Sequence, residues 1–153
     1  MDLRIAITDD LNSEREKLSS AIIAPFSKVG LNVGNIDEYT SGEELLRQFS
    51  AGRYDLIFLD IYMGGMSGVE TAKRIRTLDK NVMLVFVTTS NEFASESYAV
   101  KANFYLLKPV RAESIRQLAE IVAQQLKNTG CAAALVKSNM VYTLCKHMVY
   151  MLS

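Results

Sequence analysis

The stretch Leu56-Ile57-Phe58-Leu59-Asp60 places a carboxylate directly after four consecutive apolar residues. A short run without polar positions is typical of a strand that is buried on both faces, as in a parallel sheet covered by helices on each side. We therefore expect residues 56–60 to form a central strand. Such a strand would deliver Asp60 to the carboxyl edge of the sheet.

Other short apolar runs precede and follow this one, with helical patterns between them. The predicted strands are residues 3–8, 33–39, 56–60, 82–88 and 104–107. This alternation indicates βαβ units and hence a parallel sheet. Residues 33–39 are mixed and polar, so we expect the second strand at an edge. An edge second strand beside a central first and third matches the order 2-1-3-4-5, a flavodoxin-like, doubly wound α/β fold with five parallel strands.

Two predicted helices begin with a capping box, in which a serine and a glutamate three residues later satisfy each other's free backbone amides. The pairs are Ser41 with Glu44 and Ser67 with Glu70. The basic run at 73–76 is expected to be the solvated face of its helix. The apolar positions expected to face the sheet are Val69, Ala72 and Ile75 in that helix and Ile115, Leu118, Ala119, Val122 and Leu126 in a helix after Pro109.

Length and charge limit the classes of protein to consider. With 153 residues, 49% of them hydrophobic, the chain can form one full domain but not two. Seventeen basic and seventeen acidic residues give a net charge of zero, which argues against binding to nucleic acid or a membrane surface by this chain alone. Cys131 and Cys145 lack metal-ligand spacing, and we expect free thiols. The start resembles no signal peptide and no apolar run is membrane-length, so we expect a soluble, cytoplasmic protein.

Turn residues at 128–130 predict a domain boundary, so residues 1–128 and 129–153 are treated separately. Residues 129–153 contain two or three short strand patterns, including a hairpin turn at 138–140. So few residues cannot bury a core, and the tail must pair with something, pack on the main domain or begin a domain that continues further. His147, the only histidine, is expected to be exposed and not a ligand.

Acidic and basic side chains follow the predicted strands. Asp9 and Asp10 come after the first strand, Asp60 after the third, Thr88 ends the fourth and Lys108 follows the fifth. Because the carboxyl ends of parallel strands meet at one edge, we expect these groups to lie together. Clustered carboxylates repel unless a cation neutralises them, and hard oxygen ligands suit Mg²⁺. A carboxylate can also attack phosphorus, with Lys108 and Thr88 meeting the developing charges.

The loop after the first strand has no glycine and carries two carboxylates, Asp9 and Asp10, which would repel the phosphate of a flavin or nucleotide brought without a metal. In combination, the residues at the strand ends resemble the receiver domain of two-component response regulators over residues 1–128. That resemblance implies that Asp60 is the phosphoacceptor. It also implies that Asp9, Asp10, Asp60 and the backbone carbonyl of Tyr62 hold Mg²⁺.

The same resemblance assigns further roles. Lys108 would hold the phosphoryl group, Thr88 and Tyr105 would be the switch pair, and the Lys108–Pro109 bond would be cis. Taken alone, Tyr105 is better explained as a half-buried core residue. The implied partners are a sensor histidine kinase and a second copy of the chain, bound through the fourth helix, fifth strand and fifth helix.

The segments 86–94 and 105–109 look like the receiver subgroup whose output is a LytTR DNA-binding domain. Residues 129–153 are similar to a linker and the first strands of that domain, so DNA would be bound only through the missing remainder. Two positions depart from the usual receiver pattern. Thr89 replaces a small residue and is expected to narrow access to Asp60, and Gly64 replaces a proline and is expected to loosen its loop.

Other interpretations remain open at this stage. Asp9 or Asp10 alone could simply cap a helix. A receiver-like module that binds other proteins without being phosphorylated is the main alternative. A phosphate-ester hydrolase is weaker, because Tyr62 stands where such enzymes usually place a second acid. We therefore expect no enzyme activity beyond phosphorylation and dephosphorylation of the chain itself.

Overall fold

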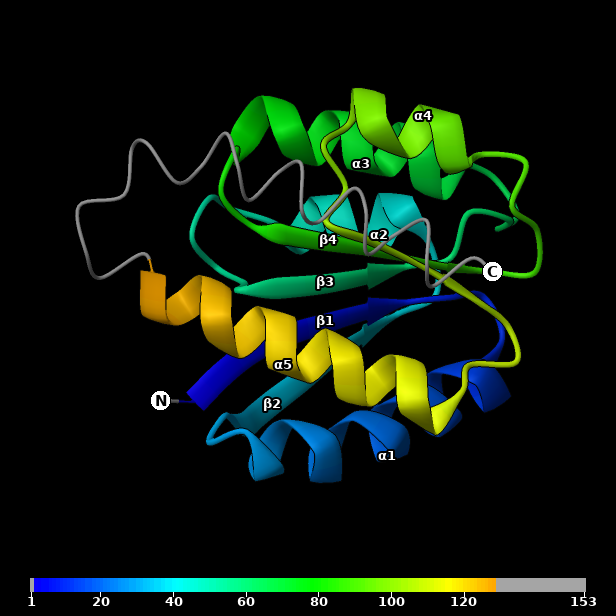
Figure 1. Ribbon diagram of the computed structural model, residues 1–153. Coiled ribbons are helices and arrows are strands. Elements are labelled where there is room, and N and C mark those ends of the chain that lie inside the picture. Colours follow the sequence, from blue (N-terminus) through cyan, green and yellow to red (C-terminus); the bar gives the residue numbers. More distant parts are fainter. Residues whose placement is uncertain (1, 129–153) are drawn as a thin grey trace.

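A computed structural model describes residues 2–128 of the chain as a five-stranded sheet between two layers of helices (Figure 1). The strands are β1 (Asp2–Thr8), β2 (Asn32–Tyr39), β3 (Leu56–Leu59), β4 (Met83–Thr88) and β5 (Phe104–Leu107), and the helices are α1 (Asn12–Lys28), α2 (Gly42–Gln48), α3 (Gly68–Leu78), α4 (Ala94–Ala99) and α5 (Ala112–Asn128). The expected hairpin at 138–140, both cysteines, His147 and the predicted LytTR strands lie outside the described residues.

The sheet confirms the predicted topology. All pairings are parallel and the order is β2-β1-β3-β4-β5. β3 is central and its four residues are all buried, whereas β2 is at an edge and largely exposed or half-buried. Only strand ends differ from expectation, each by one residue: β1 begins at Asp2, β2 at Asn32 and β4 at Met83, and β3 ends at Leu59. The continuous apolar run therefore did identify the middle of the sheet.

Alternation along the strands divides the core into two parts, one on each face of the sheet. The α1 and α5 side includes Ile5, Ile7, Phe58 and Val85 from the strands with Ile22, Phe26, Leu118 and Val122 from the helices. The side of α2, α3 and α4 includes Ala6, Ile57, Leu59, Leu84 and Phe86 with Leu45, Val69, Ala72 and Ile75. Figure 1 shows these two helical layers on opposite faces. Burial on both faces explains why the central strands read as unbroken apolar runs.

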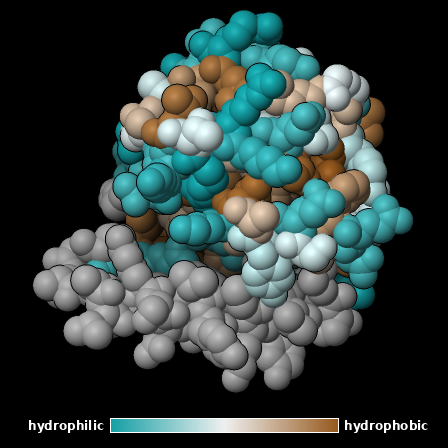
Figure 2. All heavy atoms as spheres, turned by 90° about the horizontal axis from the view of Figure 1, so that it is seen from above, coloured by the Kyte–Doolittle hydropathy of each residue, from teal (hydrophilic) through white to brown (hydrophobic). Residues whose placement is uncertain are grey.

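The outer surface of the layer that contains α3 and α4 is shown in Figure 2. It is mainly hydrophilic, with hydrophobic residues gathered in smaller patches between the polar ones. Within residues 2–128, no helix has the length and apolar character needed to cross a lipid bilayer.

Both predicted serine caps are present. The backbone N–H of Glu44 donates to the Ser41 hydroxyl over 3.1 Å, and that of Glu70 donates to Ser67 over 3.2 Å. The return bonds differ from the expected boxes. The Glu44 carboxylate accepts from the backbone N–H of Thr40, one residue before the cap, and no return bond from Glu70 is seen among the described residues. The serine half of the motif therefore sets where α2 and α3 begin.

The expectation of a solvated basic face at 73–76 is wrong for Arg76. Its guanidinium donates to the backbone carbonyls of Val82 (2.7 Å), Val100 (2.8 Å) and Lys101 (3.0 Å). Burial lowers the pKa of Arg76 despite the nearby charge of Asp79. Arg76 thus ties the end of α3 to the start of β4 and to the segment after α4.

The start of α3 lies against the end of β3. The backbone N–H of Gly68 donates to the Ile61 carbonyl over 3.0 Å, and a Cβ at this position would lie 2.1 Å from the carbonyl oxygen of Asp60. No real Cβ tolerates that separation. Glycine at 68 is therefore required for α3 to approach the segment that carries Asp60.

We predict that Gly68→Ala lowers the free energy of unfolding by about 3 kcal/mol, because the new methyl group must displace backbone atoms and not a flexible side chain. Urea denaturation measures this change. Gly64→Ala is the matched control, since a Cβ there meets nothing within 4 Å. Its free energy of unfolding should stay within about 0.5 kcal/mol of the wild type. Equal stability of the two variants would contradict the proposed close approach.

Candidate functional site: an acidic cluster at the carboxyl ends of the strands

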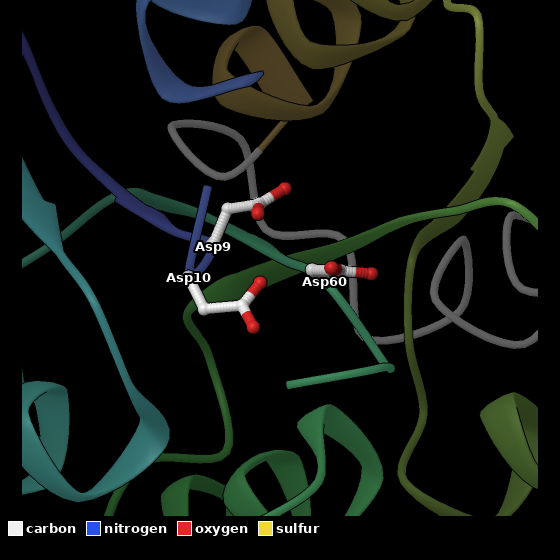
Figure 3. Close-up of side chains that lie close together, drawn as sticks. All are labelled: Asp9, Asp10 and Asp60. Atoms are coloured by element: carbon white, nitrogen blue, oxygen red, sulfur yellow. The ribbon is translucent and has the colours of Figure 1, made fainter. Parts of the chain in front are cut away.

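The carboxyl ends of β1 and β3 bring together the three aspartates that the sequence singled out (Figure 3). One carboxylate oxygen from each of Asp9, Asp10 and Asp60 lies within 4.8 Å of the other two. Asp9 and Asp60 are buried, whereas Asp10 is exposed. This is an oxygen-rich site with one open side, as a hard divalent cation requires.

Lys108, which follows β5, supplies positive charge to this cluster. Its Nζ lies 2.6 Å from Asp9 Oδ2, 3.4 Å from Asp60 Oδ2 and 4.0 Å from Glu14 Oε2. Burial lowers the pKa of Lys108, but the hydrogen bond that its ammonium donates to Asp9 and the charges of Asp60, Asp9 and Glu14 outweigh burial and raise the pKa. Lys108 is therefore protonated. The Lys108–Pro109 peptide bond, which precedes α5, is cis, as the resemblance implied.

Every polar group of Asp9 is held. Its backbone N–H donates to the Tyr39 carbonyl over 3.1 Å, and its carbonyl accepts from Arg15 Nη1 at 2.7 Å. One carboxylate oxygen accepts from the Leu11 N–H at 2.9 Å and the other from Lys108. Asp9 is thus fixed by one strand, one helix and two loop segments, which makes it the rigid member of the cluster.

Asp60 is the buried carboxylate nearest the centre of the sheet, with 6% of its surface exposed. Its backbone N–H donates to the Thr8 carbonyl and its Oδ1 accepts from the Tyr62 N–H at 3.3 Å. Burial raises the pKa of Asp60 to about 6, and the charge of Lys108 partly offsets this rise. Asp60 therefore combines ionisation at neutral pH with weak solvation, which favours a nucleophilic carboxylate.

Thr88 ends β4 with a hydroxyl that has no hydrogen-bond partner among the described residues. Its side chain is completely buried. A buried hydroxyl without a partner costs free energy that a new hydrogen bond would recover. A hydrogen-bond acceptor brought close to the Thr88 hydroxyl would therefore be favourable.

Tyr105 in β5 differs from the half-buried core residue expected from the sequence. It is completely buried, its hydroxyl donates to the Ser90 carbonyl at 2.5 Å, and its ring meets Phe86 edge to face. Burial raises the pKa of Tyr105 to about 12. Tyr105 therefore connects the segment just after Thr88 to the core.

Tyr62 links two loops beside Asp60. Its hydroxyl donates to Glu92 at 2.9 Å and its ring packs edge to face on Phe93. The segment 90–93 is thus held by two tyrosines, Tyr62 from the loop after β3 and Tyr105 from β5.

A cavity of about 510 Å³ opens beside the cluster. Asp60 and Lys108 line it together with Leu18 of α1 and Val110, and the exposed Thr89 lies at it as well. Thr89 is therefore placed where it can influence access to Asp60. Gly64 has open space around it.

One contributor to the site was missed from the sequence, namely Arg15. A signal was present, because Arg15 precedes Leu18 by three residues, Ile22 by seven and Phe26 by eleven, and so lies on the buried stripe of α1. A charged residue on an apolar stripe indicates a buried partner. Here that partner includes the backbone of Asp9.

A family model described as the response regulator receiver domain matches residues 5–120. The chain belongs to this family. Sensory transduction protein LytR of Staphylococcus haemolyticus is 35% identical over 101 residues, which cover 66% of this chain and 39% of that protein. This receiver domain chain spans less than half the length of the curated relatives that it matches.

Two solved receiver structures show the same arrangement. The REC domain of AraT, a response regulator from Geobacillus stearothermophilus, aligns with a TM-score of 0.71 and 27% identity over 85% of this chain and 99% of that one. TrrA of Thermotoga maritima, solved in complex with Mg(2+)-BeF, aligns with a TM-score of 0.64 and 32% identity over 78% of this chain and 98% of that one.

The unpartnered hydroxyl of Thr88 leads to a stability prediction. Thr88→Val keeps the shape of the side chain and loses no hydrogen bond, so the variant should be as stable as the wild type or about 1 kcal/mol more stable in urea denaturation. Thr71→Val is the matched control, since Thr71 is equally buried but donates to the Ser67 carbonyl at 2.9 Å. It should lose about 1 kcal/mol. A similar loss for Thr88→Val would show that this hydroxyl has a partner.

The raised pKa of Asp60 leads to a pH prediction. Between about pH 4 and pH 6, folded Asp60 keeps a proton that the unfolded chain releases, so stability from this group is present below pH 4 and is lost as the pH rises through 6. Asp60→Asn lacks this dependence. In metal-free buffer, the unfolding free energy of Asp60→Asn minus that of the wild type should therefore rise by about 2 kcal/mol between pH 4 and pH 7. A difference independent of pH would contradict the raised pKa.

Proposed function

We propose that this receiver domain accepts a phosphoryl group on Asp60 from the phosphohistidine of a sensor histidine kinase, in a reaction that requires Mg²⁺. One observation carries the proposal: a buried, weakly solvated carboxylate lies 3.4 Å from a lysine ammonium group and beside two further carboxylates. Family membership supports the same role for the domain.

The donor set fits Mg²⁺. Three carboxylates face one ammonium group, so the cluster keeps an excess of negative charge that a divalent cation would balance. Asp9, Asp10 and Asp60 would hold the ion with the backbone carbonyl of Tyr62. When bound, Mg²⁺ would neutralise charge on the phosphoryl oxygens. The TrrA complex with Mg(2+)-BeF supports this assignment by relationship.

The chain's own residues account for the transfer step. An Asp60 oxygen forms a bond to phosphorus while the phosphorus–nitrogen bond to the donor imidazole breaks, and the electron pair of that bond stays on the nitrogen. Lys108 is already within 3.4 Å of Asp60, where its charge can stabilise the phosphoryl oxygens. Asp9 holds Lys108 in place at 2.6 Å.

We infer that the response to phosphorylation begins at Thr88. Added negative charge at Asp60 offers its unpartnered hydroxyl a strong acceptor, so β4 and the segment after it would be drawn toward the site. Tyr105 holds that segment through the Ser90 carbonyl and would move with it. The resulting change would reach the face formed by α4, β5 and α5, which we propose as the surface for dimerisation or output.

The full protein would act through a second domain. Its relatives named LytR and LytT are more than twice the length matched here, which supports a LytTR-type DNA-binding output following residues 1–128. DNA binding would then belong to that domain, in keeping with the zero net charge of this chain. The cytoplasmic location expected from the sequence remains a prediction.

Incubation with acetyl phosphate, followed by intact-mass measurement, tests the function. We expect a single phosphoryl adduct that requires both Mg²⁺ and Asp60, because both the nucleophile and charge neutralisation are needed. Asp60→Asn and samples with excess chelator should show none. Asp37→Asn, which removes an acid outside the cluster, is the matched control and should be labelled normally.

A folded wild-type protein without an adduct under any of these conditions would overturn the phosphoacceptor role. The domain would then be better described as an interaction module that keeps the receiver fold. An adduct that survives in Asp60→Asn would move the acceptor to another residue.

A further inference from the structure

Arg15 is a nearly buried cation in the first half of α1, with 8% of its surface exposed. It occupies the same helical stripe as Leu18, Ile22 and Phe26, which pack into the core. Burying a guanidinium is unfavourable unless its donors are paired. The partners of Arg15 therefore indicate why a charged residue lies on an apolar stripe.

Three nitrogens of Arg15 reach three different acceptors. Nη1 donates to the backbone carbonyl of Asp9 at 2.7 Å, Nη2 to Asn12 Oδ1 at 2.9 Å and Nε to Glu38 Oε2 at 3.2 Å. A guanidinium is a rigid planar fork, so three fixed acceptors determine both its position and its orientation. The group cannot rotate without losing a bond.

Glu38 anchors this arrangement on the sheet. It lies in β2 opposite Ile7 of β1, and its second oxygen accepts from the Ser19 hydroxyl at 2.9 Å. α1, β1 and β2 are neighbours in Figure 1, so Arg15 and Glu38 join three elements. If Arg15 served only to connect α1 with β2, its hydrogen bond to Glu38 would be sufficient. Its shortest hydrogen bond goes instead to the backbone carbonyl of Asp9.

The Asp9 carbonyl belongs to the peptide group that joins the two acidic residues. Its orientation sets the direction in which the chain continues to Asp10. The Asp10 side chain is exposed, and among the described residues none forms a hydrogen bond with it. The backbone is therefore what places the Asp10 carboxylate near Asp60.

We propose that Arg15 is a positioning residue that holds the Asp9–Asp10 peptide so that Asp10 and Asp60 can share one Mg²⁺. This inference rests on the proposed function, because it assumes that Mg²⁺ binds the acidic cluster. Groups that orient metal ligands typically contribute 10–100-fold to metal affinity. The effect of Arg15 should therefore appear in Mg²⁺ affinity beyond any effect on folding.

Titration of the ¹⁵N-labelled full chain with Mg²⁺, followed by NMR at the amides of residues 9–11, tests this inference. We expect Arg15→Gln to bind Mg²⁺ at least about tenfold more weakly than the wild type. Arg15→Lys keeps the charge but replaces the planar guanidinium fork with a single ammonium group, so its affinity for Mg²⁺ should fall between those of the wild type and Arg15→Gln. Glu38→Gln, which leaves Arg15 less firmly oriented, should weaken binding by less than Arg15→Gln and provides a second variant if the latter does not fold.

Arg76→Gln is the matched control. Arg76 also donates to backbone carbonyls, but it lies near the start of β4, at the edge of the sheet opposite to the acidic cluster. Urea denaturation in parallel should show that Arg76→Gln is less stable than the wild type. The Mg²⁺ affinity of Arg76→Gln should equal that of the wild type. If Arg15→Gln binds Mg²⁺ as tightly as the wild type, this inference is overturned and the proposed function is not. The same conclusion follows if Arg76→Gln loses as much Mg²⁺ affinity as Arg15→Gln. A wild-type protein whose spectrum does not respond to Mg²⁺ would overturn the proposed function together with this inference.

Discussion

Three carboxylates share the carboxyl edge of the sheet with a single lysine ammonium group, and the structure around them is organised by this imbalance of charge. Lys108 contacts both Asp9 and Asp60 but carries a single positive charge, so the three carboxylates keep an excess of negative charge when they are ionised. Burial keeps the pKa of Asp60 near 6 even with this lysine present. The excess of negative charge is the physical basis of the proposal that a divalent cation binds here before phosphoryl transfer.

The neighbouring backbone is arranged to keep this cluster intact. Asp9 is held at its amide, carbonyl and both carboxylate oxygens, and Asp60 is held by Thr8 and Tyr62. Gly68 lets α3 begin almost in contact with the Asp60 carbonyl. In contrast, the Thr88 hydroxyl has no partner among the residues that the structure describes. The proposed response at Thr88 uses this difference, because charge added at Asp60 would change which hydrogen bonds are favourable for the Thr88 hydroxyl.

Sequence reasoning succeeded where local pattern and position coincide. The apolar run before Asp60 predicted the central strand, the polar run at 33–39 predicted the edge strand, and both serine caps were found. It failed where a side chain's surroundings come from distant segments. Arg76 belongs to a basic run that looks solvated, yet the carbonyls that bind it come from the residue just before β4 and from the segment after α4.

The sequence by itself determined the strand order and the placement of acids and lysine at one edge, because these follow from periodicity and from where polar residues end apolar runs. Membership of the receiver family rests instead on the resemblance of the combined motifs and on the match of the family model to residues 5–120. Only the tertiary structure decided the contacts. Lys108 meets Asp9 across 99 residues of sequence, and Arg15 reaches the Asp9 carbonyl because helix α1 turns back over β1 and β2. Distances, burial and pKa shifts arise from packing between elements, which no single segment of the chain encodes.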